Sequence, residues 1–216
     1  MKELIEKYLE PLKSDENHRF KSWEHCYKAF NNEFESEDFL ALHLAFYLAS
    51  WGMYRGSGGL LWKDYKIHIG AVNIIKKYHN LRGVFTGDLP KIQEILNVFR
   101  ELFQYYSKIE FKNGYNESSY ITPTDTLISK IILGTLGCLP AFDRYFNIGA
   151  FSKEYSRINL KSLEKIWLKV EEKKSQIVLV QQWIFEEYQV WYPPMKIIDM
   201  YYWQKGVEEK INTIQQ

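Results

Sequence analysis

Cysteine is nearly absent from this chain: among 216 residues only Cys26 and Cys138 occur, far apart and in no paired motif. This scarcity excludes a disulfide framework, a zinc ribbon and a four-cysteine iron–sulfur loop. So few thiols also fit a reducing compartment, and we expect a cytoplasmic protein.

Long hydrophobic runs are lacking as well. The longest apolar run, residues 39–53, includes His43 and is shorter than the ~20 residues that a bilayer span needs. The first ten residues, MKELIEKYLE, are amphipathic and acidic, which is not typical of a signal peptide. We therefore expect a soluble protein with no membrane partner.

A strong charge of one sign is also missing, because 28 basic and 27 acidic side chains leave a net charge of +1. The chain as a whole is therefore no general binder of polyanions. The charges are uneven, however, since residues 60–112 carry nine basic and five acidic side chains. Such an excess is either a solvated face or a local patch that attracts phosphate, and the second alternative makes DNA the expected partner.

Helical periodicity dominates what is present. The chain is 46% hydrophobic and 17% aromatic, and its length suits one domain. We predict a single all-α domain over residues 1–216, with a division into sub-lobes 1–120 and 121–216 left open. Apolar residues at three- and four-residue spacing predict helices over residues 4–12, 18–34, 37–53, 67–78, 92–103, 124–137 and 195–204. Residues 142–150 are expected to form a short helix or a turn, and residues 160–187 one long helix or two. Thr124 or Asp125 is the expected N-cap of the helix over 124–137.

Three details of this pattern are specific enough to test. Ser36 is the expected N-cap of the helix over 37–53, which is apolar nearly all round and should be the buried central element. Residues 112–123 form a polar segment with an Asn-Gly pair and are predicted to be a loop. Gly206 is the expected end of the last helix.

The segment 121–146 is the most informative for function, because an apolar helix runs into Gly-Cys-Leu-Pro and one acid, Asp143, follows the break. An aspartate at this position is either the N-cap of the next helix or a reacting carboxylate. A carboxylate beside a sugar C1′ can stabilise the positive charge that develops when an N-glycosidic bond breaks. Both alternatives stay open at this point.

The pattern from Leu127 to Asp143, with Lys130 on the helix and Pro-Ala-Phe-Asp after it, resembles the helix-hairpin-helix DNA glycosylase superfamily. It is most similar to short bacterial members with an 8-oxoguanine-glycosylase-type fold. The C-terminal MKIIDMYYWQKG is similar to the closing helix of such proteins. The resemblance implies that Asp143 is the catalytic acid and that Lys130 is the amine nucleophile of a bifunctional enzyme. Otherwise Lys130 is an ordinary surface lysine.

A second cluster combines aromatic, basic and glycine residues after the helix over 37–53. Trp51 and Tyr54 could stack a base, and glycine N–H groups with Arg55 could hold phosphate. The cluster is not a P-loop, because no Gly-Lys-Ser/Thr closes it. The other interpretation is a helix end with packed aromatics and a flexible loop. The candidate substrate-binding residues are Trp51, Tyr54, Arg55, Trp62, Lys63 and Lys66.

The histidines suggest no metal site, and no cofactor is expected. We predict that His43 is a hydrogen-bonded core histidine. Asp199 either pairs with a buried arginine such as Arg144 or caps or lines a site, and pairing is favoured because a buried acid needs a partner. The function predicted from these residues is excision of a modified or damaged base from DNA, in repair or in defence against phage. The alternative is a non-catalytic helical interaction module of a defence or regulatory system.

Overall fold

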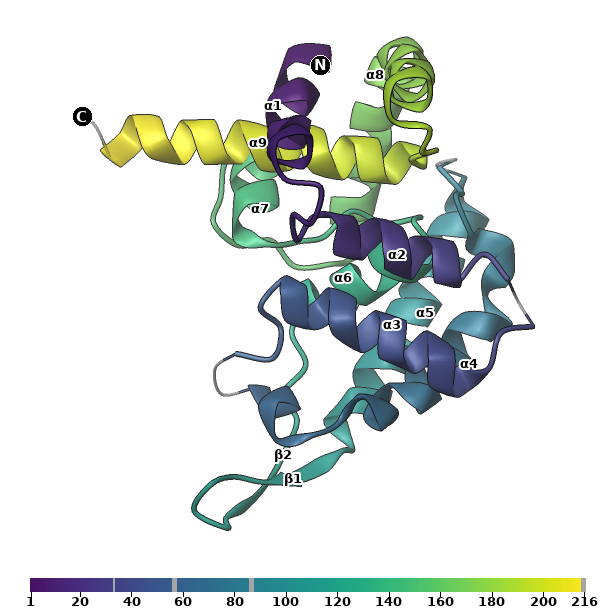
Figure 1. The fold of residues 1–216 in the computed structure, drawn as a ribbon, viewed down its shortest axis with the longest axis vertical. Helices are drawn as coiled ribbons and strands as arrows, with labels where there is room; N and C mark the ends of the chain where they lie inside the picture. Colours follow the sequence, from purple (N-terminus) through teal and green to yellow (C-terminus); the bar gives the residue numbers. More distant parts are fainter. Residues whose placement is uncertain (33, 56–57, 86–87, 215–216) are drawn as a thin grey trace.

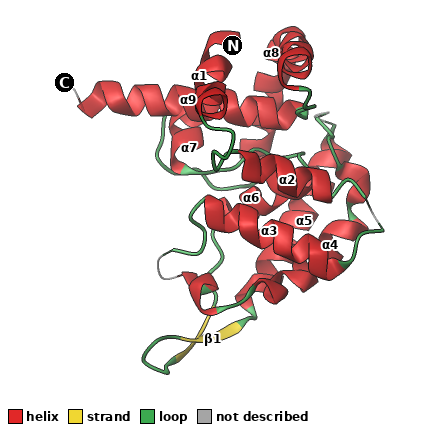
Figure 2. Cartoon of the chain, viewed as in Figure 1, coloured by secondary structure: helices red, strands yellow, loops and turns green. Residues whose placement is uncertain are grey.

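Nine α-helices and one two-stranded sheet make up the part of the chain that the computed structural model describes, residues 1–32, 34–55, 58–85 and 88–214. The predicted all-α class is therefore confirmed (Figure 2). The α-helices are α1 (Lys2–Ser14), α2 (Lys21–Ala29), α3 (Glu37–Ser50), α4 (Ile69–Lys77), α5 (Leu89–Ser107), α6 (Asp125–Thr135), α7 (Arg144–Phe151), α8 (Leu160–Tyr188) and α9 (Pro194–Ile214).

The buried centre of the molecule is α6 and not α3 (Figure 1). Every residue of α6 from Leu127 to Thr135 is buried, whereas α3 exposes an apolar stripe at Phe39, Leu42 and Phe46. The prediction that the all-apolar helix is the central element was therefore wrong. Helices α2, α3 and α5 surround α6, and the Trp23 indole N–H of α2 donates to the Leu133 carbonyl of α6 at 3.0 Å.

The predicted Ser36 cap is confirmed, because its hydroxyl accepts the Phe39 N–H at 3.2 Å. The segment before α4 differs from a single helical run: residues 60–62 and 65–68 form short 3-10 turns, and α4 begins only at Ile69. The second helix is also shorter than residues 18–34, because α2 covers only Lys21–Ala29.

The predicted loop over 112–123 contains a β-hairpin instead. Strand β1 (Glu110–Lys112) pairs antiparallel with β2 (Ser118–Tyr120), with Glu110 opposite Tyr120. The turn is held by the Asn113 side chain, whose oxygen accepts the N–H groups of Tyr115 and Glu117 at 2.9 and 3.0 Å. The loop between the strands spans residues 113–117, and Asn116 takes the positive φ of +63° that it requires.

Helix α9 passes through Gly206 and continues to Ile214, so the predicted stop was wrong. The glycine is needed for a close crossing of two helices rather than for a cap. A Cβ on Gly206 would lie 1.9 Å from the Tyr145 carbonyl oxygen of α7, and a Cβ on Gly149 would lie 2.0 Å from the Tyr202 carbonyl oxygen of α9. Two facing glycines therefore let the backbones of α7 and α9 touch.

Helix α1 packs across α9, so the first and last helices of the chain are in contact (Figure 1). Helix α8 is a single helix that also packs on α9. No helix of the described residues has an apolar stretch long enough to cross a bilayer.

Candidate functional site

Three buried charged side chains and one partly buried one meet where α6, α7 and α9 come together. We call them the lysine–aspartate centre: Lys130, Lys196 and Asp199, which are buried, and Asp143, which is partly buried. Lys130 Nζ lies 3.0 Å from Asp143 Oδ2, and Lys196 Nζ lies 3.0 Å from Asp199 Oδ2. The side chains are only 4–16% exposed. Buried charges are costly unless paired, and here two ammonium groups face two carboxylates.

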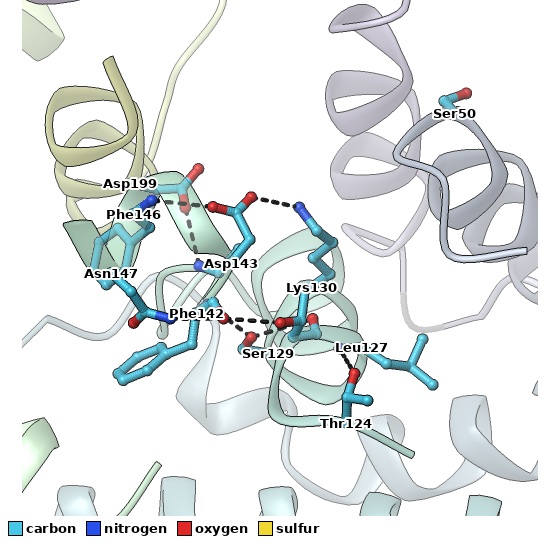
Figure 3. Close-up of polar contacts among 12 residues, drawn as sticks. Ser50, Thr124, Leu127, Ser129, Lys130, Phe142, Asp143, Phe146, Asn147 and Asp199 are labelled. Atoms are coloured by element: carbon cyan, nitrogen blue, oxygen red, sulfur yellow. Dashed lines mark hydrogen bonds and ion pairs between the residues drawn. The ribbon is translucent and has the colours of Figure 1, made fainter. Parts of the chain in front are cut away.

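Asp143 is the N-cap of α7, so the capping alternative is confirmed. Its Oδ1 accepts the Phe146 N–H at 3.0 Å, and its Oδ2 accepts from Lys130 (Figure 3). Lys130 is therefore no surface lysine, because its side chain is 5% exposed. One carboxylate oxygen fixes the helix start, while the other oxygen is presented to an amine.

The loop before Asp143 is held by side chains of two helices, α6 and α9 (Figure 3). Ser129 Oγ of α6 accepts the Phe142 N–H at 2.9 Å, and Thr126 Oγ1 donates to the Phe142 carbonyl at 2.9 Å. From α9, Asp199 Oδ1 accepts the Ala141 N–H at 2.9 Å. Because each of these buried backbone groups has a partner, the position of Asp143 is fixed by the fold and not by a free loop.

Asp199 does not pair with Arg144, so that prediction was wrong. Its partner is Lys196, one turn earlier in α9, whereas Arg144 pairs with the exposed Glu154. Lys196 Nζ also donates to the Tyr8 hydroxyl at 3.2 Å. The second ion pair therefore ties α1 and the loop before α7 to α9.

Trp51 forms the aromatic wall of the centre. Lys130 Nζ lies 4.6 Å from the Trp51 ring centroid and Lys196 Nζ lies 5.8 Å from it, so both ammonium groups make cation–π contacts. Phe20 stacks on Trp51 at 5.1 Å, and Trp203 meets it edge to face at 6.4 Å. The Trp51 indole nitrogen is buried and has no hydrogen-bond partner among the described residues.

A cavity of about 10 Å³ lies within the centre. A volume of this size holds at most one water molecule and is far too small for a nucleobase. The residues that line it are Tyr47, Trp51, Lys130, Leu133, Ala141, Asp143, Lys196, Asp199 and Trp203. The centre is therefore closed as it stands.

Two buried tyrosines are kept protonated near the centre. Burial raises the pKa of the Tyr8 hydroxyl well above its ordinary value, and the negative charges of Asp199 and Asp143 raise it further. Burial likewise raises the pKa of Tyr47 well above its ordinary value, with Asp199 again adding to the effect. Both groups are therefore neutral hydroxyls at physiological pH.

The remaining predicted site residues do not line this cavity. Tyr54 instead hydrogen-bonds His68 Nε2 at 2.7 Å, and Arg55 is exposed. Trp62 and Lys66 are exposed and Lys63 is partly exposed, and residues 56–57 of the glycine loop lie outside the described part of the chain. Of the predicted site residues the fold thus brings together Lys130, Asp143 and Trp51, and substrate binding by the other five stays a prediction.

The prediction that His43 is a core histidine was wrong, and another histidine takes that place. His43 is only partly buried, against the Phe39 ring, whereas the fully buried histidine is His68. The rings of His68 and two tyrosines form a chain, with His68 Nδ1 2.5 Å from the Tyr106 hydroxyl and Nε2 bonded to Tyr54. Burial lowers the pKa of His68 to about 4. Among the described residues, no cluster of histidine, cysteine and carboxylate side chains is placed to hold a metal ion.

Sequence reasoning missed Lys196, Tyr47 and Trp203 as members of the centre. A signal for the first of these was present, because Lys196 and Asp199 stand three residues apart in the otherwise apolar segment 194–203. Comparison of the chain with protein-family models, curated proteins and solved structures finds no significant match. The function of the centre is therefore inferred from its geometry.

Proposed function

We propose that the protein is a base-excising enzyme that cleaves the N-glycosidic bond of a modified or damaged base in DNA. The observation that carries the proposal is the buried amine–carboxylate pair of Lys130 and Asp143, 3.0 Å apart beside the Trp51 ring. Buried ionisable pairs with a specific partner are candidates for reacting groups, although ion pairs also serve stability. The amine can act as a nucleophile, the carboxylate can stabilise the sugar cation and the aromatic ring can stack an extruded base, so each group suits this reaction.

The reaction assigns one role to each group. The Lys130 ammonium gives a proton to the leaving base as the bond between C1′ and the base nitrogen breaks. As the amine left on Lys130 bonds to C1′, the Asp143 carboxylate stabilises the positive charge on the sugar. The C1′–O4′ bond then breaks and one proton passes from the lysine nitrogen to O4′, which opens the sugar ring and leaves an iminium between Lys130 and C1′. Water hydrolyses the resulting iminium, which leaves an abasic site and returns the lysine. If water attacks C1′ directly, the same carboxylate acts and no covalent adduct forms.

Access for a base requires Trp51 to move, because the cavity holds no more than one water. Trp51 is the residue directly after α3, and Gly52 follows it with a φ of +75°. Since the indole nitrogen has no partner among the described residues, rotating the ring out breaks no hydrogen bond of the indole. It gives up the cation–π contacts with Lys130 and Lys196 and the stacking on Phe20. An entering base can replace the contact with Lys130 through its own ring face.

The kinship with helix-hairpin-helix glycosylases belongs to the same proposal. Its support is the unit α6–loop–α7, in which a lysine on one helix meets the aspartate that begins the next helix. Helices α5 and α6, by contrast, are joined through the β1–β2 hairpin rather than by a short hairpin turn. Repair and defence against modified phage DNA are both compatible with this chemistry.

The test is base release from a panel of duplexes that each carry one modified base. Asp143→Asn keeps a capping oxygen for Phe146 but removes the charge, so we expect base release to fall by at least 100-fold, roughly the lower end of what one catalytic group contributes. The matched control is Asp88→Asn, because Asp88 caps α5 in the same way, accepting the Lys91 N–H at 2.9 Å far from the centre along the chain. Wild-type protein that releases no base from any duplex refutes the proposal.

Borohydride reduction separates the two chemical routes. A covalent protein–DNA adduct in the wild type that disappears in Lys130→Met identifies the lysine as the nucleophile. Base release without any adduct assigns the reaction to water and Asp143. Thermal or urea unfolding of each variant is measured alongside, because either substitution leaves a buried charge without its partner.

A second candidate function is an interaction module, and one observation favours it. Helix α8 exposes large apolar side chains, with Leu168 65% and Leu179 66% exposed, and Trp191 follows the helix at 57%. Exposed apolar residues of this kind are typical of protein–protein contact surfaces. Under this function, charged substitutions at Leu168 and Leu179 abolish complex formation, whereas Asp143→Asn does not.

A further inference from the structure

A broad hollow that shares no residue with the lysine–aspartate centre lies between the end of α7 and the first half of α8. It has a volume of about 590 Å³. Four lysines and one glutamate line it, together with polar and apolar residues of both helices. We call it the lysine groove and define it by Lys153, Lys161, Lys165, Lys169 and Glu172.

Two of the three glutamates in the first half of α8 lie on a different face from the groove lysines, and the third, Glu172, lines the groove. Lys161, Lys165 and Lys169 follow one another at four-residue spacing and therefore lie on the same face. Glu164 and Glu171 are seven residues apart and line a different hollow with Ile92, Trp167 and Leu168. A count over residues 113–216 finds equal numbers of basic and acidic residues, so this separation appears only when the helix is formed.

The groove lysines are not neutralised within the protein. None of the ion pairs between described residues involves the four lysines of the groove, whereas Lys7, Lys91 and Lys210 elsewhere are paired. Lys169 Nζ lies 5.4 Å from the Tyr202 ring centroid, and one turn later Lys173 Nζ lies 5.5 Å from the Tyr201 ring centroid. These ring contacts restrain the side chains while leaving the charges available to an anion.

The spacing of the lysines matches a chain of phosphates better than a single anion. Four residues of helix rise about 6 Å, so Lys161 to Lys169 span about 12 Å along α8. One nucleic-acid strand carries a phosphate about every 3.4 Å of helix axis, so this span faces three or four phosphates. Ser152 and Ser156 also line the groove, and hydroxyl groups commonly donate to phosphate oxygens.

We infer that the lysine groove is the surface on which this protein holds the sugar-phosphate backbone of a nucleic acid. The choice of a nucleic acid over another polyanion rests on the proposed function. The groove lysines, rather than the loop residues Arg55, Lys63 and Lys66, are then the main phosphate contact. Those three residues line none of the larger hollows of the described surface.

The experiment compares two variants that each lose three positive charges. The groove variant is Lys161→Gln/Lys165→Gln/Lys169→Gln, and the matched control is Arg55→Gln/Lys63→Gln/Lys66→Gln. Binding of an unmodified duplex is measured at a series of salt concentrations. Each lost phosphate contact lowers the slope of log K against log salt by about 0.9, so we expect the groove variant to lose up to ~2.7 of slope and the control to keep the wild-type value.

Other outcomes overturn the inference. A loss of slope in the control but not in the groove variant assigns the backbone contact to the loop. If the wild-type protein binds polyglutamate as tightly as it binds DNA, and the groove variant loses that binding, the groove is a site for an acidic protein. Wild-type protein that binds no duplex at low salt also refutes it. Because Asp143→Asn should bind unmodified DNA with the wild-type slope, failure of excision and failure of the groove are separate results.

Discussion

At the crossing of α7 and α9, replacing a helical glycine by alanine should lower the stability of the protein, although helix propensity alone predicts a gain. Gly149 lies inside α7, where alanine ordinarily stabilises a helix by roughly 1 kcal/mol over glycine. At this position the new Cβ would lie 2.0 Å from the Tyr202 carbonyl oxygen and 2.9 Å from the Gly206 nitrogen. We therefore expect Gly149→Ala to destabilise the protein.

The size of the effect follows from the contact. Ordinary van der Waals contact begins at 3.4 Å, so α7 and α9 must separate by about 1.4 Å to relieve a 2.0 Å approach. The obstacle is backbone, and no side-chain rotation removes it. Overpacking of a core costs about 1–3 kcal/mol, and a backbone clash belongs at the upper end. After the gain in propensity we expect a net loss of about 2 kcal/mol in the free energy of unfolding.

The assay is urea unfolding followed by tryptophan fluorescence, with linear extrapolation to water. Gly206→Ala should cost a similar amount, because its Cβ would lie 1.9 Å from the Tyr145 carbonyl oxygen. The double variant should lose less than the sum of the two single losses, since both act on one crossing. Gln176→Ala on the exposed part of α8 is the control and should change stability by less than about 0.5 kcal/mol. A Gly149→Ala protein as stable as the wild type refutes the close crossing.

Three further predictions concern other parts of the fold. Burial lowers the pKa of His68 to about 4, below its unfolded value near 6.5, so the unfolded chain binds a proton that the folded chain does not. Stability should therefore fall by about 3 kcal/mol as pH drops from 6.5 to 4, and unfolding curves of His68→Gln that show the same fall would contradict this. Ser36→Ala should cost about 1 kcal/mol and Ser36→Asp should restore it, because the hydroxyl caps α3; an unchanged urea midpoint in Ser36→Ala would exclude the cap. Arg82→Lys should cost about 2 kcal/mol, because the planar guanidinium donates to two carbonyls at once, that of Thr135 at 2.5 Å and that of Tyr27 at 2.7 Å. A loss under about 0.5 kcal/mol in the same assay would show that the two-armed guanidinium is not needed.

Local signals predicted helices well where a cap or an apolar stripe was explicit. Ser36 and Thr124 both cap the helices that follow them, as Ser and Thr side chains do when they precede an apolar periodic segment. Local signals failed where a contact with a distant segment decides the geometry. Gly206 has the appearance of a helix stop, but α9 continues through it. The position is a glycine because a Cβ there would meet the backbone of Tyr145.

The candidate site was predictable in part for the same reason. Asp143 and Lys130 are 13 residues apart on consecutive helices, so a local pattern could join them. Asp199 is 58 residues from Ala141, to which it bonds, and Lys196 is 188 residues from Tyr8. No periodicity relates such positions, because the fold alone brings them together.

The sequence by itself determined the helical class, the two capped helix starts and the presence of one acid after the proline break. These features depend on backbone geometry and on residues within a few positions of each other. Only the tertiary structure decided that α6 is the buried helix, that Lys130 is enclosed with Asp143, and that the lysines of α8 face a hollow. Burial and charge separation depend on which distant faces pack together, and the chain fixes that only when it folds.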